Sequence, residues 1–133
     1  MRLTDYTDYT LRTLMHLGMN RDKLVTIKEI ADIHGISKNH LMKVARHLGI
    51  NGIVDTVRGR NGGLRLKKEP KDINIGDVVR TTETDFNMAE CFDRTNLSCA
   101  YTRSCSLKAV LHTATTAYLD VLDGVTLDSL LSR

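Results

Sequence analysis

Two short helices joined by a glycine turn and followed by a glycine-rich hairpin constrain the fold of this 133-residue chain more than any other feature. A Thr-Ile-Lys-Glu capping box begins the first of these helices at Thr26, and Gly35 ends it, because glycine tolerates the left-handed backbone of a sharp turn. Ser37 caps the next helix, which is predicted over 38–48 and stopped by Gly49. This order is typical of the helix-turn-helix, whose second helix enters the DNA major groove, although it also occurs in unrelated helical domains.

The hairpin that follows favours a DNA-binding domain. Residues 53–57 alternate as a strand, 58–63 form a basic, glycine-rich turn, and 64–66 alternate back. Between Ser37 and Lys68 the chain has eight Lys and Arg residues against one acidic residue, which predicts a continuous cationic surface for phosphates. A nucleotide-binding loop would open into a helix, whereas this turn opens into a strand, so we interpret the hairpin as the wing of a winged helix.

The remaining periodicity predicts a mainly α fold around this small β-hairpin. A first helix over 4–17 begins at Thr4 and stops at Gly18, and the apolar spacing over 73–79 predicts a short helix beneath the DNA-binding domain. The three predicted parts are a winged helix-turn-helix over 1–80, a loop over 81–106, and a long dimerisation helix with a C-terminal tail over 107–133.

The long helix that is predicted to begin at residue 107 has a large apolar face. Its apolar side chains recur at three- and four-residue steps over about four turns. Because so small a domain offers little surface to cover this face, we expect a second copy of the helix to cover it. A symmetric homodimer on a palindromic double-stranded DNA operator follows. The alternative is that the helix folds back onto its own domain.

Charge divides the chain into a basic part and an acidic part. Residues 1–80 carry 15 Lys and Arg against 9 Asp and Glu, a net +6, whereas residues 81–133 carry 4 against 7, a net −3. The basic part favours a polyanionic partner. We expect a cytoplasmic protein, because no apolar run approaches the ~20 residues that span a membrane and no secretory leader pattern opens the chain. The sequence pairs no nucleophile with a general base, which argues against an enzyme.

All three cysteines of the chain, Cys91, Cys99 and Cys105, fall in one polar loop. Three soft thiolates on a single loop suit a zinc ion or an iron-sulfur cluster, since both prefer sulfur ligands, although the set is one ligand short of four. Free thiols, or one disulfide with a spare cysteine, are the alternative. Free cysteines are usually spread over buried core positions, so their clustering in a loop favours metal binding.

Several motifs taken together resemble a known family of regulators. They are the opening Met-Arg-Leu-Thr-Asp-Tyr-Thr-Asp-Tyr-Thr-Leu-Arg, the Ile-Ser-Lys-Asn-His-Leu-Met-Lys-Val recognition segment, the Val-Arg-Gly-Arg-Asn-Gly-Gly-Leu-Arg-Leu wing, Met-Ala-Glu-Cys-Phe, and three cysteines before a long helix. Over nearly its whole length the chain resembles the nitric-oxide-sensing repressors of the NsrR type. These belong to a broader family of dimeric winged-helix regulators that includes the iron-sulfur regulator IscR and the iron-responsive regulator RirA.

The resemblance implies that Cys91, Cys99 and Cys105 bind an iron-sulfur cluster, of the 4Fe-4S type with 2Fe-2S as the alternative. IscR-like members add a histidine three residues after the last cysteine, where this chain has Lys108. NsrR-like proteins complete the cluster with a carboxylate from the first helix of the other subunit, and Asp8 occupies that place here. From the residues alone Asp8 has a simpler explanation. A carboxylate early in a helix is favoured by the helix dipole, and it can form an ion pair with Arg12 one turn later.

The resemblance also implies a function. The holo dimer would bind its operator and repress transcription, and nitric oxide would damage the cluster, lower operator affinity and derepress nitric oxide detoxification genes. The alternatives are an iron- or redox-responsive regulator like RirA and a winged-helix regulator with structural zinc. An enzyme or electron carrier would leave the basic wing without a role.

Two sets of residues are predicted to contact DNA, because asparagine can pair with adenine while lysine and arginine reach guanine or phosphate. The set at the major groove is Ser37, Lys38, Asn39, His40 and Lys43, and the set near the minor groove or the backbone is Arg58, Arg60, Asn61 and Gly62.

Overall fold

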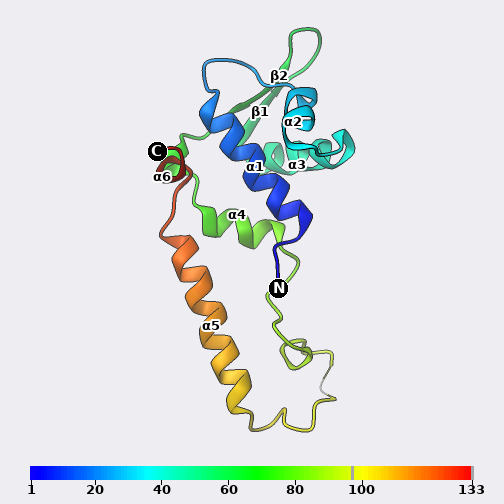
Figure 1. The fold of residues 1–133 in the computed structure, drawn as a ribbon, viewed down its shortest axis with the longest axis vertical. Helices are drawn as coiled ribbons and strands as arrows, with labels where there is room; N and C mark the ends of the chain where they lie inside the picture. The colour runs from blue at the N-terminus through cyan, green and yellow to red at the C-terminus, as the bar shows by residue number, and fades with distance from the viewer. Residues whose placement is uncertain (97, 133) are drawn as a thin grey trace.

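The protein folds into a helical head that carries a two-stranded hairpin, and one long helix extends away from this head (Figure 1). The computed structural model describes residues 1–96 and 98–132. In chain order its elements are α1 (Asp5–Met19), α2 (Ile27–His34), α3 (Lys38–Ile50), β1 (Val54–Val57), β2 (Gly63–Leu66), the 3-10 turn η1 (Pro70–Asp72), α4 (Ile75–Thr82), the 3-10 turn η2 (Glu90–Phe92), α5 (Ser106–Asp123) and α6 (Leu127–Leu131). The predicted fold class, mainly α with a small β-hairpin, is confirmed.

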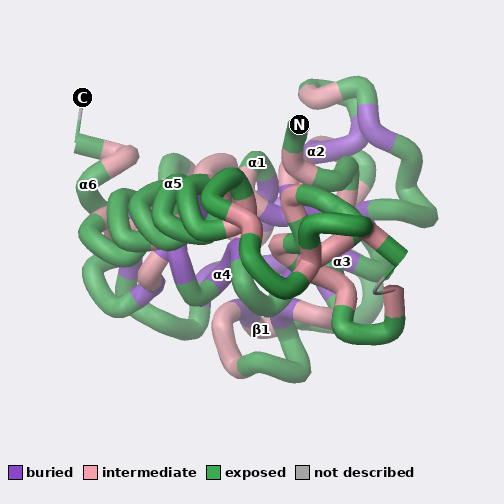
Figure 2. The backbone as a smooth tube through the Cα atoms, turned by 90° about the horizontal axis from the view of Figure 1, so that it is seen from below, coloured by how far each residue is buried: buried purple, intermediate pink, exposed green. Residues whose placement is uncertain are grey.

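The core of the head forms where α1 packs against α3, α4 and α6. The fully buried side chains include Leu14 and Leu17 from α1, Leu41 and Leu48 from α3, and Leu127 from α6. These leucines recur at the three- and seven-residue steps of amphipathic helices, so each helix turns one apolar stripe inward. Buried positions gather in the head, whereas α5 is exposed along most of its length (Figure 2).

The starts of α1, α2 and α3 lie at the capping residues that the sequence indicates. The side chains of Thr4, Thr26, Ser37 and Thr126 each accept a hydrogen bond from a backbone N–H in the first turn of the helix that follows. The capping box at Thr26 is only half formed, because the carboxylate of Glu29 accepts a bond from Lys23 Nζ at 2.8 Å. Local side-chain chemistry therefore sets where each helix begins.

Replacing Thr26 with alanine is expected to lower the free energy of unfolding by about 1 kcal/mol, because Thr26 Oγ1 accepts from the Glu29 N–H at 3.0 Å and alanine leaves that donor without a side-chain partner. Urea unfolding followed by circular dichroism measures this change. Thr26→Ser, which retains the hydroxyl, is the matched control and should unfold within a few tenths of a kcal/mol of the unmodified protein. Equal losses in both variants would mean that the cap does not stabilise α2.

Two of the predicted helix stops are wrong. Both Gly18 and Gly49 lie inside helices, which end one residue later at Met19 and at Ile50. Gly18 is needed for close packing instead, since a Cβ atom there would collide with the Leu131 side chain of α6. After α3 the left-handed position belongs to Gly52, with φ +71°.

The hairpin confirms the predicted wing. Its strands pair antiparallel, with Val54 opposite Leu66 and Val57 opposite Gly63. Leu64 also exchanges backbone hydrogen bonds with the segment before α2, and its side chain is buried, so the base of the wing belongs to the core of the head. The turn itself projects from the head (Figure 1).

The chain leaves the head after α4, and the long helix α5 brings it back, so that the C-terminal end of α5 lies beside α4 (Figure 1). Asp123 at its end forms an ion pair with Arg80, and its carbonyl accepts from Asn74 Nδ2 at 2.7 Å. These bonds fix the end of α5 to α4. The last helix, α6, then packs on α1 and buries Leu127 completely, so the C-terminal tail contributes to the core of the head. Among the described residues, no helix is both long and apolar enough to cross a membrane.

Candidate nucleic-acid interface and cysteine loop

Helix α3 is held in the head by one apolar face and two aromatic contacts. Its buried residues are Leu41, Val44, Ala45 and Leu48. On the side toward α1, the Tyr6 ring lies 5.7 Å from the His47 ring in an edge-on arrangement, and the Tyr9 ring lies 5.7 Å from the His40 ring. The orientation of α3 is therefore coupled to that of α1.

The outer face of α3 contains the residues predicted for the major groove. Lys38, Asn39, His40 and Lys43 are all exposed. The hydroxyl of Ser37 accepts from the His40 N–H at 3.2 Å, so Ser37 begins the helix as well as lying at its exposed N-terminal end. Arg46, one turn beyond Lys43, is also exposed on this helix and was missed as a candidate, although its spacing in the sequence puts it on the same face.

The wing presents a second set of exposed cations. Arg58, Arg60 and Asn61 are exposed, and Asn61 has φ +68°, a left-handed conformation that asparagine tolerates. A Cβ atom on Gly62 would collide with the Val57 carbonyl oxygen, so only glycine closes this turn. The ion pairs found among the described residues include none with Arg58 or Arg60, which leaves both guanidinium groups available to an external anion.

The segment over 91–105, which contains all three cysteines, lies below the head on the side opposite the wing (Figure 1). Cys91 is in η2, Cys99 is in the loop, and Cys105 is the N-cap of α5, where its sulfur accepts from the Lys108 N–H at 3.4 Å. All three are half-buried free thiols. Within one chain, the described residues bring together no group of three or more His, Cys, Asp or Glu side chains that could hold a metal ion.

Asp8 lies on α1 and not in the cysteine loop. Its carboxylate, 39% exposed, accepts two hydrogen bonds from Arg12, at 2.8 Å and 3.0 Å. This is the pairing expected from the sequence alone. Three free thiols and one accessible carboxylate are a donor set whose chemistry fits an iron-sulfur cluster.

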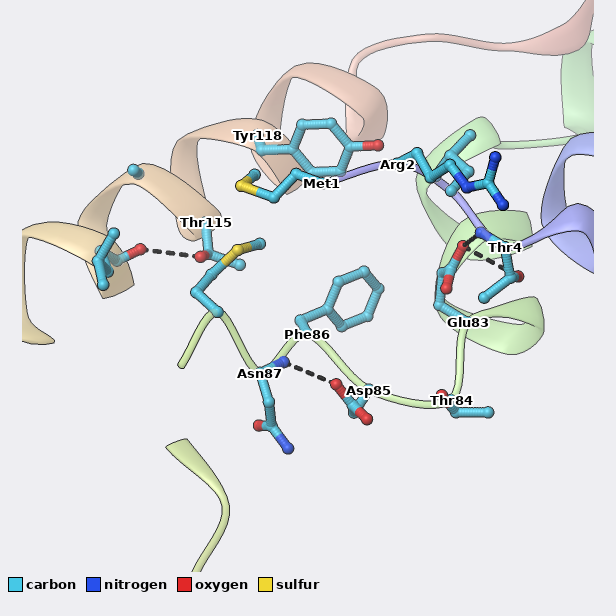
Figure 3. A pocket seen from close by; sticks show the side chains of 14 residues that line it. Met1, Arg2, Thr4, Glu83, Thr84, Asp85, Phe86, Asn87, Thr115 and Tyr118 are labelled. Atoms are coloured by element: carbon cyan, nitrogen blue, oxygen red, sulfur yellow. Dashed lines mark hydrogen bonds between the residues drawn. The ribbon is translucent and has the colours of Figure 1, made fainter. Parts of the chain in front are cut away.

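An open cavity of about 610 Å³ separates the N-terminal segment from α5 (Figure 3). Phe86 of the linker after α4 and Tyr118 of α5 face into it, and most of the surface that lines it is apolar. On one side Thr4 donates from its backbone N–H to Glu83 Oε1 at 2.9 Å, which ties the start of α1 to the linker that leads to Cys91. The start of the helix that carries Asp8 is therefore held to the start of the segment that leads to the cysteine loop.

A pair of histidines lies between α1 and α2. The rings of His16 and His34 are 5.5 Å apart, and each Nε2 atom is buried without a hydrogen-bond partner among the described residues. Burial lowers the pKa of His34 below its ordinary value; positive charge on His16 and Arg12 adds to this, and Asp8 opposes it. Both features favour a neutral His34 in the folded protein.

Acidification from pH 7.5 to 5.5 is expected to destabilise the protein through His34. Below pH ~6.5 the unfolded chain protonates this histidine while the folded chain, with its lower pKa, does not, so the free energy of unfolding falls until the pH reaches the folded-state pKa. Urea unfolding at several pH values measures the loss, which should be smaller in His34→Gln. His112→Gln, at an exposed histidine of α5, is the control and should keep the original pH dependence. Identical profiles for all three proteins would exclude His34 as the cause.

A helix-turn-helix fixed on an apolar core, a basic wing after it in the chain and a long helix that projects from the head together define a winged helix-turn-helix DNA-binding regulator. The Rrf2 family, described as iron-dependent transcriptional regulators, matches residues 3–133, and the chain belongs to this family. The prediction that it is no enzyme is confirmed, since its relatives are named transcriptional regulators.

The curated relatives are similar over nearly their whole length. The HTH-type transcriptional regulator NsrR of Bacillus licheniformis is 55% identical over 98% of this chain and 92% of its own length. NsrR of Bacillus subtilis is 54% identical over 100% of this chain and 92% of its own. Among solved structures, IscR of T. potens has a TM-score of 0.76 at 26% identity, covering 98% of this chain and 86% of that one. Oxidized CymR of Staphylococcus aureus, at 23% identity and a TM-score of 0.81 over 100% of this chain and 98% of that one, shares the fold.

Proposed function

We propose that this DNA-binding regulator is a homodimeric, cytoplasmic repressor that senses nitric oxide through an iron-sulfur cluster. The observation that carries the proposal is that every cysteine of the chain is a free thiol in the one loop at the base of α5. The relatives named NsrR, at 54 and 55% identity, support the choice of signal. In this proposal residues 1–80 bind DNA, 81–106 bind the cluster and 107–133 dimerise.

Cys91, Cys99 and Cys105 would hold the cluster, and Asp8 of the partner subunit would complete the set. When bound, the cluster supplies iron that nitric oxide can attack, most readily at a carboxylate-held iron, since oxygen is a harder and weaker ligand than thiolate. Asp8 lies half-exposed on α1 and can exchange its Arg12 partner for a ligand role. Asp8 lies between Tyr6 and Tyr9 in the sequence, so a change in its ligation can move the helix that contacts α3.

Tyr6 and Tyr9 contact the recognition helix, so a force on Asp8 acts through α1 on α3. While Asp8 is held across the dimer, the two α3 helices keep the spacing that a palindromic operator requires. When Asp8 is released, it can pair with Arg12 of its own helix again. The two heads then lose their fixed separation. An affinity loss of about 5- to 150-fold requires only ~1–3 kcal/mol of coupling, so a small shift of the heads is sufficient.

A homodimer is supported by the surface of α5. Leu107, Val110, Tyr118 and Val121 are large apolar residues that are 44–69% exposed in the single chain. An open, largely apolar cavity adjoins the same helix. Monomeric proteins rarely leave such a surface uncovered, and a second copy of α5 matches it by symmetry.

The first experiment is an anaerobic absorption spectrum of the freshly isolated protein, with iron and sulfide analysis, before and after titration with nitric oxide. The expected result is a broad visible band that bleaches in proportion to the nitric oxide added, together with release of operator DNA. A colourless protein that cannot be reconstituted with iron and sulfide, or that contains zinc, would overturn the cluster assignment and leave the winged-helix regulator intact.

An iron-responsive repressor is the second candidate, favoured by the description of the whole Rrf2 family as iron-dependent. It would use the same cysteines but release DNA when iron is scarce. Titration of the DNA complex with nitric oxide and, separately, with an iron chelator distinguishes the two, because the physiological signal should act at the lower dose.

Replacing Asp8 with alanine is expected to leave a cluster bound but to change its absorption spectrum and its reaction with nitric oxide. The fold should be unaffected, since an exposed ion pair such as Asp8 with Arg12 contributes about 0–1 kcal/mol. Asp5→Ala removes an equivalent exposed carboxylate from the same helix turn and is the matched control. If Asp8→Ala and Asp5→Ala both behave like the unmodified protein, Asp8 is not a ligand.

A further inference from the structure

The recognition helix presents one large apolar side chain in the middle of its polar outer face. Met42 is 60% exposed, although the helix buries four apolar residues on its inner face. Its neighbours one turn away on either side, Lys38 and Arg46, are exposed and basic, and Lys43 beside it is exposed as well. Met42 therefore lies inside the cationic surface and outside the core.

The position of Met42 makes it different from a scattered surface residue. Helix spacing places it on the same face as Asn39, three residues before it, and Arg46, four residues after it. When the cations of this face lie against phosphates, the centre of the face lies against the base edges. Met42 would then be enclosed by DNA, and an apolar side chain enclosed there is favourable only against an apolar group.

The major groove offers one such group, the C5 methyl of thymine, because the other base-edge atoms are hydrogen-bond donors and acceptors. Methionine suits this contact, since its unbranched, polarizable side chain adapts to an irregular surface. We infer that Met42 determines operator specificity by contacting a thymine methyl in each half-site. The inference rests on the proposed role of α3 as the DNA-reading helix and adds to it the base and the atom that one residue reads.

Uracil substitution isolates this contact, because uracil lacks the methyl group but keeps every hydrogen-bonding atom of thymine. Duplexes are first selected from a random pool with the unmodified protein. Each thymine of the selected site is then replaced by uracil, in symmetry-related pairs, and affinity is measured at fixed salt. At one pair of positions the unmodified protein should lose about tenfold, the value expected for two buried methyl groups.

The same scan with Met42→Ala gives the decisive comparison. Met42→Ala should bind the thymine site more weakly and show no further loss with uracil at that pair of positions, because the two changes remove the same contact. Ile33→Ala is the matched control, since Ile33 is 62% exposed on α2, outside the recognition helix, and should leave the uracil profile unchanged. Unfolding of each variant in urea confirms that it is folded.

Two negative results are distinguishable. Selection of no specific duplex by the unmodified protein would overturn the proposed function and this inference with it. Selection of a specific duplex whose uracil penalties are the same in the unmodified protein and in Met42→Ala at every position would overturn the role of Met42 alone.

Discussion

Replacing Cys99 with serine is expected to reduce the iron and sulfide bound per protomer to background and to lower operator affinity by about 5- to 150-fold. The serine hydroxyl is a hard donor that stays protonated at neutral pH, so it does not replace a soft thiolate. The head should remain folded, because none of the described residues between 91 and 105 belongs to the hydrophobic core. Metal analysis and operator binding under anaerobic conditions measure both effects.

Ser98→Ala is the control for this substitution, since it changes the neighbouring exposed residue without removing a thiol. It should bind iron and DNA like the unmodified protein. Full iron content in Cys99→Ser would show that this cysteine is no ligand. Normal operator affinity in a protein that has lost its iron would instead separate DNA binding from the metal and argue against the coupling through Asp8.

Local chemistry predicted most of the head correctly. The capping residues fix where α1, α2 and α3 begin, because each accepts a hydrogen bond from the first turn of the helix that follows it. The alternation of the wing strands is equally local, since the register of the hairpin follows from one short turn. Such features depend on neighbours within a few residues, which a sequence displays directly.

Of the two misplaced helix stops, the one at Gly18 arose where distant residues meet, whereas Gly49 has no such contact among the described residues. Gly18 resembles a helix stop, but its conformation is helical and its lack of a side chain makes room for Leu131, more than a hundred residues later. The packing of α6 on α1, which buries Leu127, likewise joins residues that are far apart in the sequence. No local pattern reports which helix another will pack against, so contacts of this kind require the folded structure.

The proposed metal centre is visible in the sequence only in part, because its chemistry would be local and its assembly would not. Clustering of the cysteines in one loop is visible in the sequence, and the loop is where the structure has them. In that proposal the fourth ligand would come from a second copy of the chain, whereas within a single chain Asp8 pairs with Arg12. The sequence therefore indicates the candidate thiolates by their clustering, and the candidate carboxylate only through the family resemblance.

Replacing Lys43 and Arg60 together with alanine is expected to lower operator affinity by roughly two to three orders of magnitude near 0.1 M salt. It should also reduce the slope of log affinity against log salt by about 3 to 4. Each dimer would lose four cations, and every phosphate contact contributes about 0.9 to that slope through the release of condensed counterions. Both side chains are exposed, so the variant should fold normally.

The slope, rather than the affinity alone, tests the role of these cations. Lys71→Ala with Arg21→Ala removes the same charge from exposed sites outside α3, the wing and the cysteine loop, and should alter affinity only slightly. If Lys43 bonds to a base, its removal would lower the affinity for the operator and leave the affinity for non-specific DNA unchanged. Removal of a cation that binds phosphate would lower both affinities alike. An unchanged salt slope in the Lys43 and Arg60 variant would mean that other cations fix the head on the DNA backbone, and that α3 enters the groove in an orientation different from the one its exposed face indicates.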